Sequence, residues 1–314
     1  MNKFSELIEG GTPQTQIKKR RTLTAICVTA VLIAAMLLFL AIFGIASLLA
    51  KNKKSDSKED AASTVSVGTT FKTTISEDKL YSGSLLVLDG NHPYVGIPNL
   101  VNIQNHSDRP THMVNNVEEN IYTVYGQQNQ NNLKATGSAI TALDKMISAF
   151  YKAKGDDNII IDAAYNESLI TQSAIYSSGE AFRLTYFVTP VQGSFHNQAP
   201  IYEDTKYDWI YSNAHKYGFV SVGEAKSNVF RYVGIAHSTA MKQNKLSFDE
   251  YIQSVKKYTP DSALKVSASG ENYAIYYLAK DSEHILPKDY EYTVSGNNVD
   301  GYIITVNLSR PASN

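Results

Sequence analysis

The stretch that decides the fold reads YDWIYSNAHKYGF, residues 207–219, and it is followed by FRYVGIAH, residues 230–237, and LSFDEYI, residues 246–252. A helix from about Thr205 to Tyr217 is predicted, because Gly218 is the residue type that most often ends one. The segments on either side of residues 223–228 are strand-like. Ser247 and Glu250 have the spacing of a capping box, which predicts that another helix starts there.

The flanking sequence predicts an α+β fold with two parts. Apolar residues recur three and four apart from Ser138 to Gly155, as in an amphipathic helix, and Ile159–Ile161 is typical of a buried strand. Beyond Thr259 the strands and turns follow one another without a helical pattern. We therefore expect an α+β domain over residues 71–259 and a small β-rich accessory module over residues 260–314.

A membrane anchor is predicted before these domains. Residues 22–50, TLTAICVTAVLIAAMLLFLAIFGIASLLA, contain no Asp, Glu, Lys or Arg, and about 20 apolar residues span a bilayer. A tight basic cluster, KKRR at residues 18–21, precedes the span and favours a cytoplasmic N-terminus over residues 1–21. The expected protein is a single-pass protein of the cell membrane with an extracellular C-terminal domain.

Composition narrows the other possibilities. Residues 51–70 are charged and rich in Ser and Thr, which predicts a flexible stalk. The formal net charge is -1, so no nucleic-acid partner is expected. The single cysteine excludes a disulfide framework. The common nucleotide, zincin and serine-hydrolase motifs do not occur.

The three quoted stretches, in this order, resemble the VanY-type D-alanyl-D-alanine carboxypeptidases, in which W-x-x-x-N-A-H-x-Y-G-F precedes H-F-R-Y-V-G and then L-x-x-E-E-Y. The resemblance covers roughly residues 80–258. It implies the carboxypeptidase fold, and in that family the activity is zinc-assisted removal of the terminal D-alanine from peptidoglycan stem peptides. A role in the bacterial cell wall is therefore expected.

The first zinc motif of the family, S-x-H-x-x-G-x-A-x-D, is matched by residues 194–203, SFHNQAPIYE. His196 then stands at the ligand histidine and Glu203 at the ligand aspartate, so both are candidate metal ligands by resemblance. Ser194 of this motif, and Gln172 farther upstream, are candidate substrate-binding residues on the same basis.

The second motif, E-x-W-H, has lost its chemistry. Lys226 stands at the general-base position and Val229 at the third zinc ligand. Valine has no lone pair for a metal, and a lysine ammonium takes no proton from water. Glu224 would serve as a displaced base only if the register with the following strand were broken. Asn166 stands where the family has the arginine that holds the substrate carboxylate.

These substitutions predict a degenerate member, a pseudoenzyme that has no catalytic residues and no cofactor. Its expected role is to bind a stem peptide or an envelope protein, with Lys226 as a carboxylate partner in the old cleft. One alternative is an active zinc carboxypeptidase that combines His196 and Glu203 with a third ligand such as Asp204. Another makes the β-rich tail the working part, as an interaction or assembly module.

Overall fold

The computed structural model describes residues 63–96, 98–125, 132–167, 173–188, 197–223 and 226–313. Residues 62–314 form one compact unit. The predicted cytoplasmic N-terminus, the predicted span over residues 22–50 and the stalk up to residue 62 lie outside the described residues. Among the helices that are described, none is long and apolar enough to cross a membrane.

A six-stranded mixed sheet organises the first hydrophobic core. Its strand order is β11-β12-β9-β8-β6, and β10 pairs with β9. The strands are β6 (Thr123–Val124), β8 (Ile160–Ala163), β9 (Ala181–Phe187), β10 (Gln198–Pro200), β11 (Phe219–Ser221) and β12 (Val229–Tyr232). All neighbours are antiparallel except β6 and β8.

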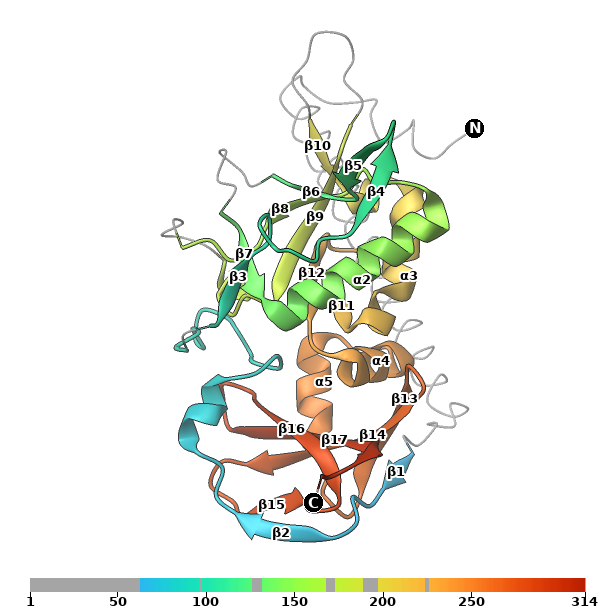
Figure 1. The fold of residues 1–314 in the computed structure, drawn as a ribbon. Helices are drawn as coiled ribbons and strands as arrows, with labels where there is room; N and C mark the ends of the chain where they lie inside the picture. Colours follow the sequence, from blue (N-terminus) through green and yellow to red (C-terminus); the bar gives the residue numbers. More distant parts are fainter. Residues whose placement is uncertain are drawn as a thin grey trace, which may run out of the picture. The chain divides into compact units, whose positions relative to one another are not determined.

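The helix α2 (Gly137–Lys154) lies across one face of this sheet (Figure 1). Thr136 caps its first turn. Gly155, in the left-handed conformation, ends the helix where the sequence predicts. The predicted helix over residues 205–217 consists of η5 (Thr205–Tyr207), α3 (Asp208–Asn213) and η6 (Ala214–Tyr217). Two further two-stranded antiparallel sheets are present, one of β3 (Leu100–Asn102) with β7 (Lys134–Thr136) and one a hairpin of β4 (Thr111–Val114) with β5 (Val117–Asn120). The short helices η3 (Ala174–Tyr176) and η4 (Ile201–Glu203) lie next to β9 and β10.

A five-stranded antiparallel sheet builds the second core, in the order β1-β13-β14-β17-β16. Its strands are β1 (Thr64–Val65), β13 (Ala263–Ala268), β14 (Glu271–Ala279), β16 (Tyr290–Gly296) and β17 (Gly301–Pro311). The helices α4 (Ile235–Asn244) and α5 (Phe248–Val255) contribute to this core (Figure 1), together with η1 (Glu77–Tyr81). β2 (Thr70–Thr73) pairs with β15 (His284–Pro287) at its side. The capping box of Ser247 and Glu250 starts α5 as predicted.

The second core is larger than the predicted accessory module. It includes Val67 and Leu80 from the N-terminal side and the residues from Val233 onward, so the predicted boundary after residue 259 is wrong. The predicted stalk is also too long, because β1 and β2 begin within it. The physical reason is shared burial: α4 and α5 put their apolar side chains against the C-terminal sheet.

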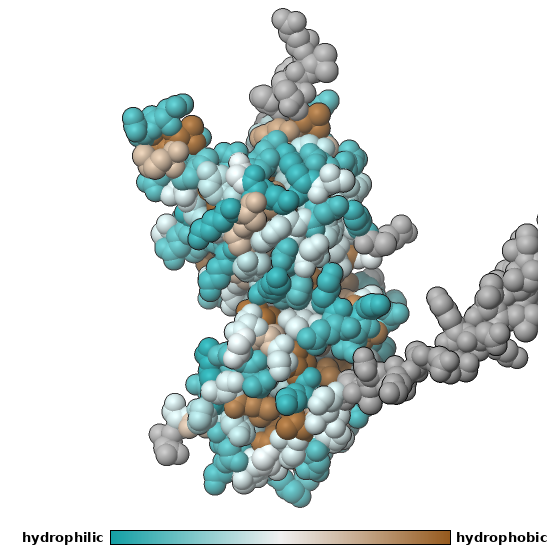
Figure 2. Space-filling view, turned by 90° about the vertical axis from the view of Figure 1, so that its right-hand side faces the viewer, coloured by the Kyte–Doolittle hydropathy of each residue, from teal (hydrophilic) through white to brown (hydrophobic). Residues whose placement is uncertain are grey.

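The face of the molecule that Figure 2 shows is mostly hydrophilic. On the face shown in Figure 2, hydrophobic residues gather mainly in the lower half, at the level of the five-stranded sheet, among hydrophilic and intermediate residues. This distribution is expected for a domain that faces water, in which large apolar side chains such as those of Ile303 and Ile304 are buried.

Candidate functional site

The structure describes only part of the predicted site. Ser194, His196 and Gln172 lie outside the described residues, as does Glu224. Glu203 is the last residue of η4 and its side chain is exposed. The roles of these four residues, and the role of Glu203 as a ligand, remain predictions.

Asp204, the third ligand in the hydrolase alternative, is already engaged. Its carboxylate accepts a hydrogen bond from the backbone N–H of Lys206 at 2.9 Å and so caps η5. The ammonium of Lys206 lies 3.8 Å from the other carboxylate oxygen. Both contacts fix Asp204 in a structural role at the start of the short helix.

Lys226 points toward α3. Its Nζ lies 2.8 Å from Oδ1 of Asp208 and 5.7 Å from the centre of the Tyr211 ring. The Tyr211 ring packs on Phe230, the neighbour of Val229 in β12. Because successive side chains of a strand face opposite sides, Lys226 lies on the side of the sheet away from Val229. The general-base position and the third-ligand position are therefore not brought together.

Val229 instead faces an arginine. Val229 and Arg183 are register partners on β12 and β9, so their side chains share one face of the sheet. Arg183 donates from Nε and from one terminal nitrogen to the two oxygens of Asp162, at 2.8 and 2.9 Å. The side chain of Asp162 is only 4% exposed, and that of Arg183 is 27% exposed. A bidentate ion pair thus lies beside the expected metal position.

The protonation of this pair follows from its contacts. Burial raises the pKa of Asp162, and the hydrogen bonds and charge of Arg183 oppose that effect. Burial also acts to lower the pKa of Arg183, but the contacts with Asp162 outweigh it and the pKa is raised. The pair is therefore ionic at neutral pH.

Tyr176 is the last residue of η3. Its side chain is buried, and burial raises the pKa of its hydroxyl. The charge of Arg183 lowers that pKa and the charge of Asp162 raises it.

The geometry reveals a second register for the first zinc motif. If S-x-H-x-x-G-x-A-x-D is laid over residues 174–183, AIYSSGEAFR, then Gly179 and Ala181 match its glycine and alanine. Gly179 has φ +75°, and a Cβ there would lie 2.3 Å from a methyl carbon of Leu100. Ala181 is fully buried. Both positions therefore require small residues, as the motif has.

In this register the ligand histidine is replaced by Tyr176 and the ligand aspartate by Arg183. The sequence analysis did not identify these residues, because His196 and Glu203 have the residue types, a histidine and a carboxylate, that the zinc motif requires. Gly179 and Ala181 match the glycine and alanine of the motif, and this match could have revealed the second register. The first register instead has Ala199 and Ile201 at the small positions.

A second buried polar pair lies next to this face. Glu180 is 8% exposed and Arg231 is 1% exposed. Burial raises the pKa of Glu180 to about 8, although the charge of Arg231 opposes it. The Arg231 guanidinium donates to the carbonyl of Ser84 at 3.2 Å and lies 4.4 Å from the Phe248 ring centre. Glu180 Oε2 and Arg231 Nε have no hydrogen-bond partner in the structure described.

The position that the resemblance assigns to the substrate arginine is closed. Asn166 is 1% exposed, so its side chain is enclosed by the protein. It follows Tyr165, whose carbonyl accepts a hydrogen bond from the Lys134 backbone N–H at 2.9 Å. This site presents no guanidinium to a ligand.

The described residues at the positions of the second register do not fit a zinc ion. Across the described ranges, no three or more His, Cys, Asp or Glu side chains come together in a group that would hold a metal. At the positions that the second register assigns to ligands stand a phenol, a guanidinium and the isopropyl group of Val229. A cation and an alkyl group cannot coordinate zinc.

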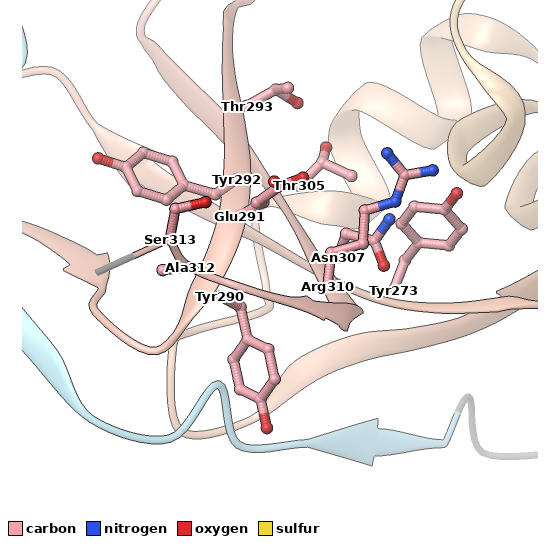
Figure 3. Close-up of a pocket in the computed structure, with 10 residues that line it drawn as sticks. All are labelled: Tyr273, Tyr290, Glu291, Tyr292, Thr293, Thr305, Asn307, Arg310, Ala312 and Ser313. Atoms are coloured by element: carbon pink, nitrogen blue, oxygen red, sulfur yellow. The ribbon is translucent and has the colours of Figure 1, made fainter.

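The β-rich part has a pocket of about 490 Å³ beside β16 and β17 (Figure 3). Glu271 accepts hydrogen bonds from the Tyr273 hydroxyl and from Arg310 Nε, at 2.5 and 2.8 Å. Figure 3 shows Tyr290 and Tyr292 directed away from Tyr273, so the rings do not converge. Arg310 is thus paired with a carboxylate of the same sheet.

Comparisons with known proteins agree with the fold. No protein-family model matches the chain. A D-alanyl-D-alanine carboxypeptidase of Enterococcus faecium is 27% identical over 281 residues, which are 82% of this chain and 86% of that protein. The crystal structure of the vancomycin-resistance D,D-dipeptidase VanXYg, in complex with a D-Ala-D-Ala phosphinate analogue, has a TM-score of 0.55 and 19% identity. That match covers 76% of this chain and 100% of the dipeptidase chain.

These matches confirm the resemblance to the VanY-type D-alanyl-D-alanine carboxypeptidases. The mixed α and β fold of the described residues is similar to that of the dipeptidase.

Proposed function

We propose that this chain, which resembles the VanY-type D-alanyl-D-alanine carboxypeptidases, binds D-alanine-terminated stem peptides of the cell wall without hydrolysing them. In this proposal residues 22–50 anchor it in the cell membrane, residues 1–21 are cytoplasmic, and the carboxypeptidase-like domain is extracellular. The domain is a pseudoenzyme that needs no cofactor.

The observation that carries the proposal is the ion pair of Arg183 and Asp162 beside Val229. A catalytic zinc site needs three protein ligands and an open position for water. Here a guanidinium lies on the face that would have to supply ligands, and it repels a metal cation. In this proposal the guanidinium of Arg183 supplies the positive charge that the zinc ion supplies in the active enzymes.

A guanidinium in a partly exposed site is suited to a carboxylate. Asp162 uses Nε and one terminal nitrogen of Arg183, and the other terminal nitrogen makes no hydrogen bond to a described residue. The two hydrogen bonds to Asp162 also hold the guanidinium of Arg183 in one orientation, which lowers the entropy lost when a ligand binds. Arg183 would thereby bind the terminal carboxylate of the peptide, in place of the family's arginine, whose position Asn166 occupies by resemblance.

The relatives support the ligand class. The Enterococcus faecium relative is named for D-alanyl-D-alanine, and the dipeptidase was solved with an analogue of that dipeptide. A stem peptide that ends in D-alanine is therefore the first ligand to test.

The test is calorimetric titration of the full chain, in neutral detergent, with a peptide that ends in D-Ala-D-Ala. We expect saturable binding, no release of D-alanine, and loss of binding with the C-terminally amidated peptide. Arg183→Gln should weaken binding by at least about tenfold, because a charged hydrogen bond contributes about 1.5–3 kcal/mol. Arg310→Gln is the matched control, since Arg310 also forms an arginine–carboxylate pair but lies on the other sheet.

Two outcomes would contradict the proposal. Release of D-alanine that a chelator abolishes would establish the alternative, an active zinc enzyme that uses His196 and Glu203. Absence of binding to every D-alanine-terminated peptide would leave an envelope protein as the partner to seek.

A further inference from the structure

A second pocket, of about 530 Å³, lies between η6, the edge strand β11 and α4. Its walls include Phe219, Phe230, Met241 and Leu246, and the first three of these are buried. Phe230 and Val229 are adjacent in β12, so this pocket lies on the other side of the strand from Arg183. It is therefore separate from the proposed peptide site.

The pocket is ringed by positive charge. Lys226, Lys242 and Lys245 line it. Lys226 is paired with Asp208 at 2.8 Å, whereas neither Lys242 nor Lys245 forms an ion pair with a described residue. The carboxyl end of α4 favours nearby cations, which accounts for the position of the two unpaired lysines but not for an apolar floor beneath them.

His215 adds an unsatisfied polar atom to the same pocket. Its Nδ1 is buried and has no hydrogen-bond partner in the part of the chain that the structure describes. Burial lowers the pKa of His215, and the charges of Lys242 and Lys216 lower it further, so the ring is neutral at pH 7. A buried polar atom without a partner costs free energy until a ligand or water satisfies it.

We propose that this pocket binds a small phosphorylated molecule that carries an apolar or aromatic group. Lysine ammonium groups bind a phosphate as point charges, and two unpaired lysines suit its charge of about −2 better than the single charge of a carboxylate. The partly exposed side chains of Tyr211, Val220 and Leu246 provide the surface against which the apolar group packs.

Phenyl phosphate is the probe, titrated calorimetrically into the full chain in neutral detergent. We expect saturable binding that weakens as ionic strength rises, because salt screens exposed lysines. The double variant Lys242→Gln/Lys245→Gln should bind about tenfold more weakly, since each exposed charge contributes up to about fivefold. His215→Leu should also weaken binding, because it removes the unsatisfied nitrogen.

The matched control is Lys280→Gln/Lys288→Gln, which removes two exposed lysines outside the pocket. It should bind phenyl phosphate as the unmodified chain does, and thermal unfolding should show that all variants are folded. The proposal is overturned if phenyl phosphate gives no saturable binding, or if the Lys242 and Lys245 variant binds as well as the control. Equal affinity for benzoate would overturn the assignment to a phosphate.

Discussion

Arg183 and Val229 are direct register partners on β9 and β12, and Arg183 is held there by two hydrogen bonds to Asp162. The residue that would be a third metal ligand therefore has an arginine, and not another ligand, as its neighbour across the strands. The proposed loss of hydrolysis rests on this relationship.

The two registers of the first zinc motif make opposite predictions for metal binding. Val229→His alone completes a ligand set with His196 and Glu203, and we expect it to hold no zinc. Tyr176→His/Arg183→Asp/Val229→His should hold about one zinc per chain, because three ligands then share one site. Metal analysis of the full chains, purified without chelators, measures both.

The unmodified chain is the reference in that experiment, and it should retain no zinc after dialysis. Zinc in the unmodified chain or in the Val229→His single variant would show that the first register is the correct one. Thermal unfolding with and without zinc provides a second readout, since a bound metal stabilises the folded state.

The pair of Arg183 and Asp162 should be strongly coupled. Arg183→Met leaves a carboxylate that is 4% exposed without its partner, so we expect a loss of about 2–3 kcal/mol in the free energy of unfolding. Asp162→Asn in the same chain should recover part of that loss, because no buried charge then remains. Urea unfolding of both single variants and the double variant gives the coupling energy. Simple additivity would mean that the two side chains do not stabilise one another.

Glu180 should make the protein less stable as pH rises. Its pKa in the folded state is raised to about 8 by burial, so the unfolded chain loses this proton at a lower pH than the folded chain does. Stability associated with Glu180 is then present below about pH 4.5 and is lost as pH rises toward about 8. Glu180→Gln should raise the melting temperature at pH 8 and change it little at pH 5. An equal increase at both pH values would rule out this titration.

His237 should make the protein less stable as the pH falls. Burial lowers its pKa to about 3, and its ring nitrogens contact the Tyr251 hydroxyl at 2.7 Å and the Thr305 hydroxyl at 2.8 Å. The unfolded chain takes up a proton below about pH 6.5 while the folded chain does not, so stability falls as the solution is acidified toward about pH 3. The expected contribution is about 2 kcal/mol between pH 7 and pH 5.

The measurement is urea unfolding of the unmodified chain and of His237→Gln at both pH values. Gln does not titrate, so the variant should be less stable at pH 7 but should lose less stability on acidification. A variant that loses as much stability as the unmodified chain would assign the acid sensitivity to other groups.

The sequence by itself determined the helices that depend on local interactions. The apolar spacing from Ser138, with Gly155 behind it, predicts α2, and the capping box of Ser247 and Glu250 predicts the start of α5. These elements depend on neighbours within a few residues of one another, so a linear pattern contains the information.

Only the tertiary structure decided which residues meet. β1 and β2 are short and have no periodic pattern, and they form because β13 and β15 supply their hydrogen-bond partners. Arg183 and Val229 are far apart in the sequence, and their meeting depends on the register of two strands. A register is set by burial across a whole sheet, so a motif search found the ligand types at His196 and Glu203 but not the residues that face Val229.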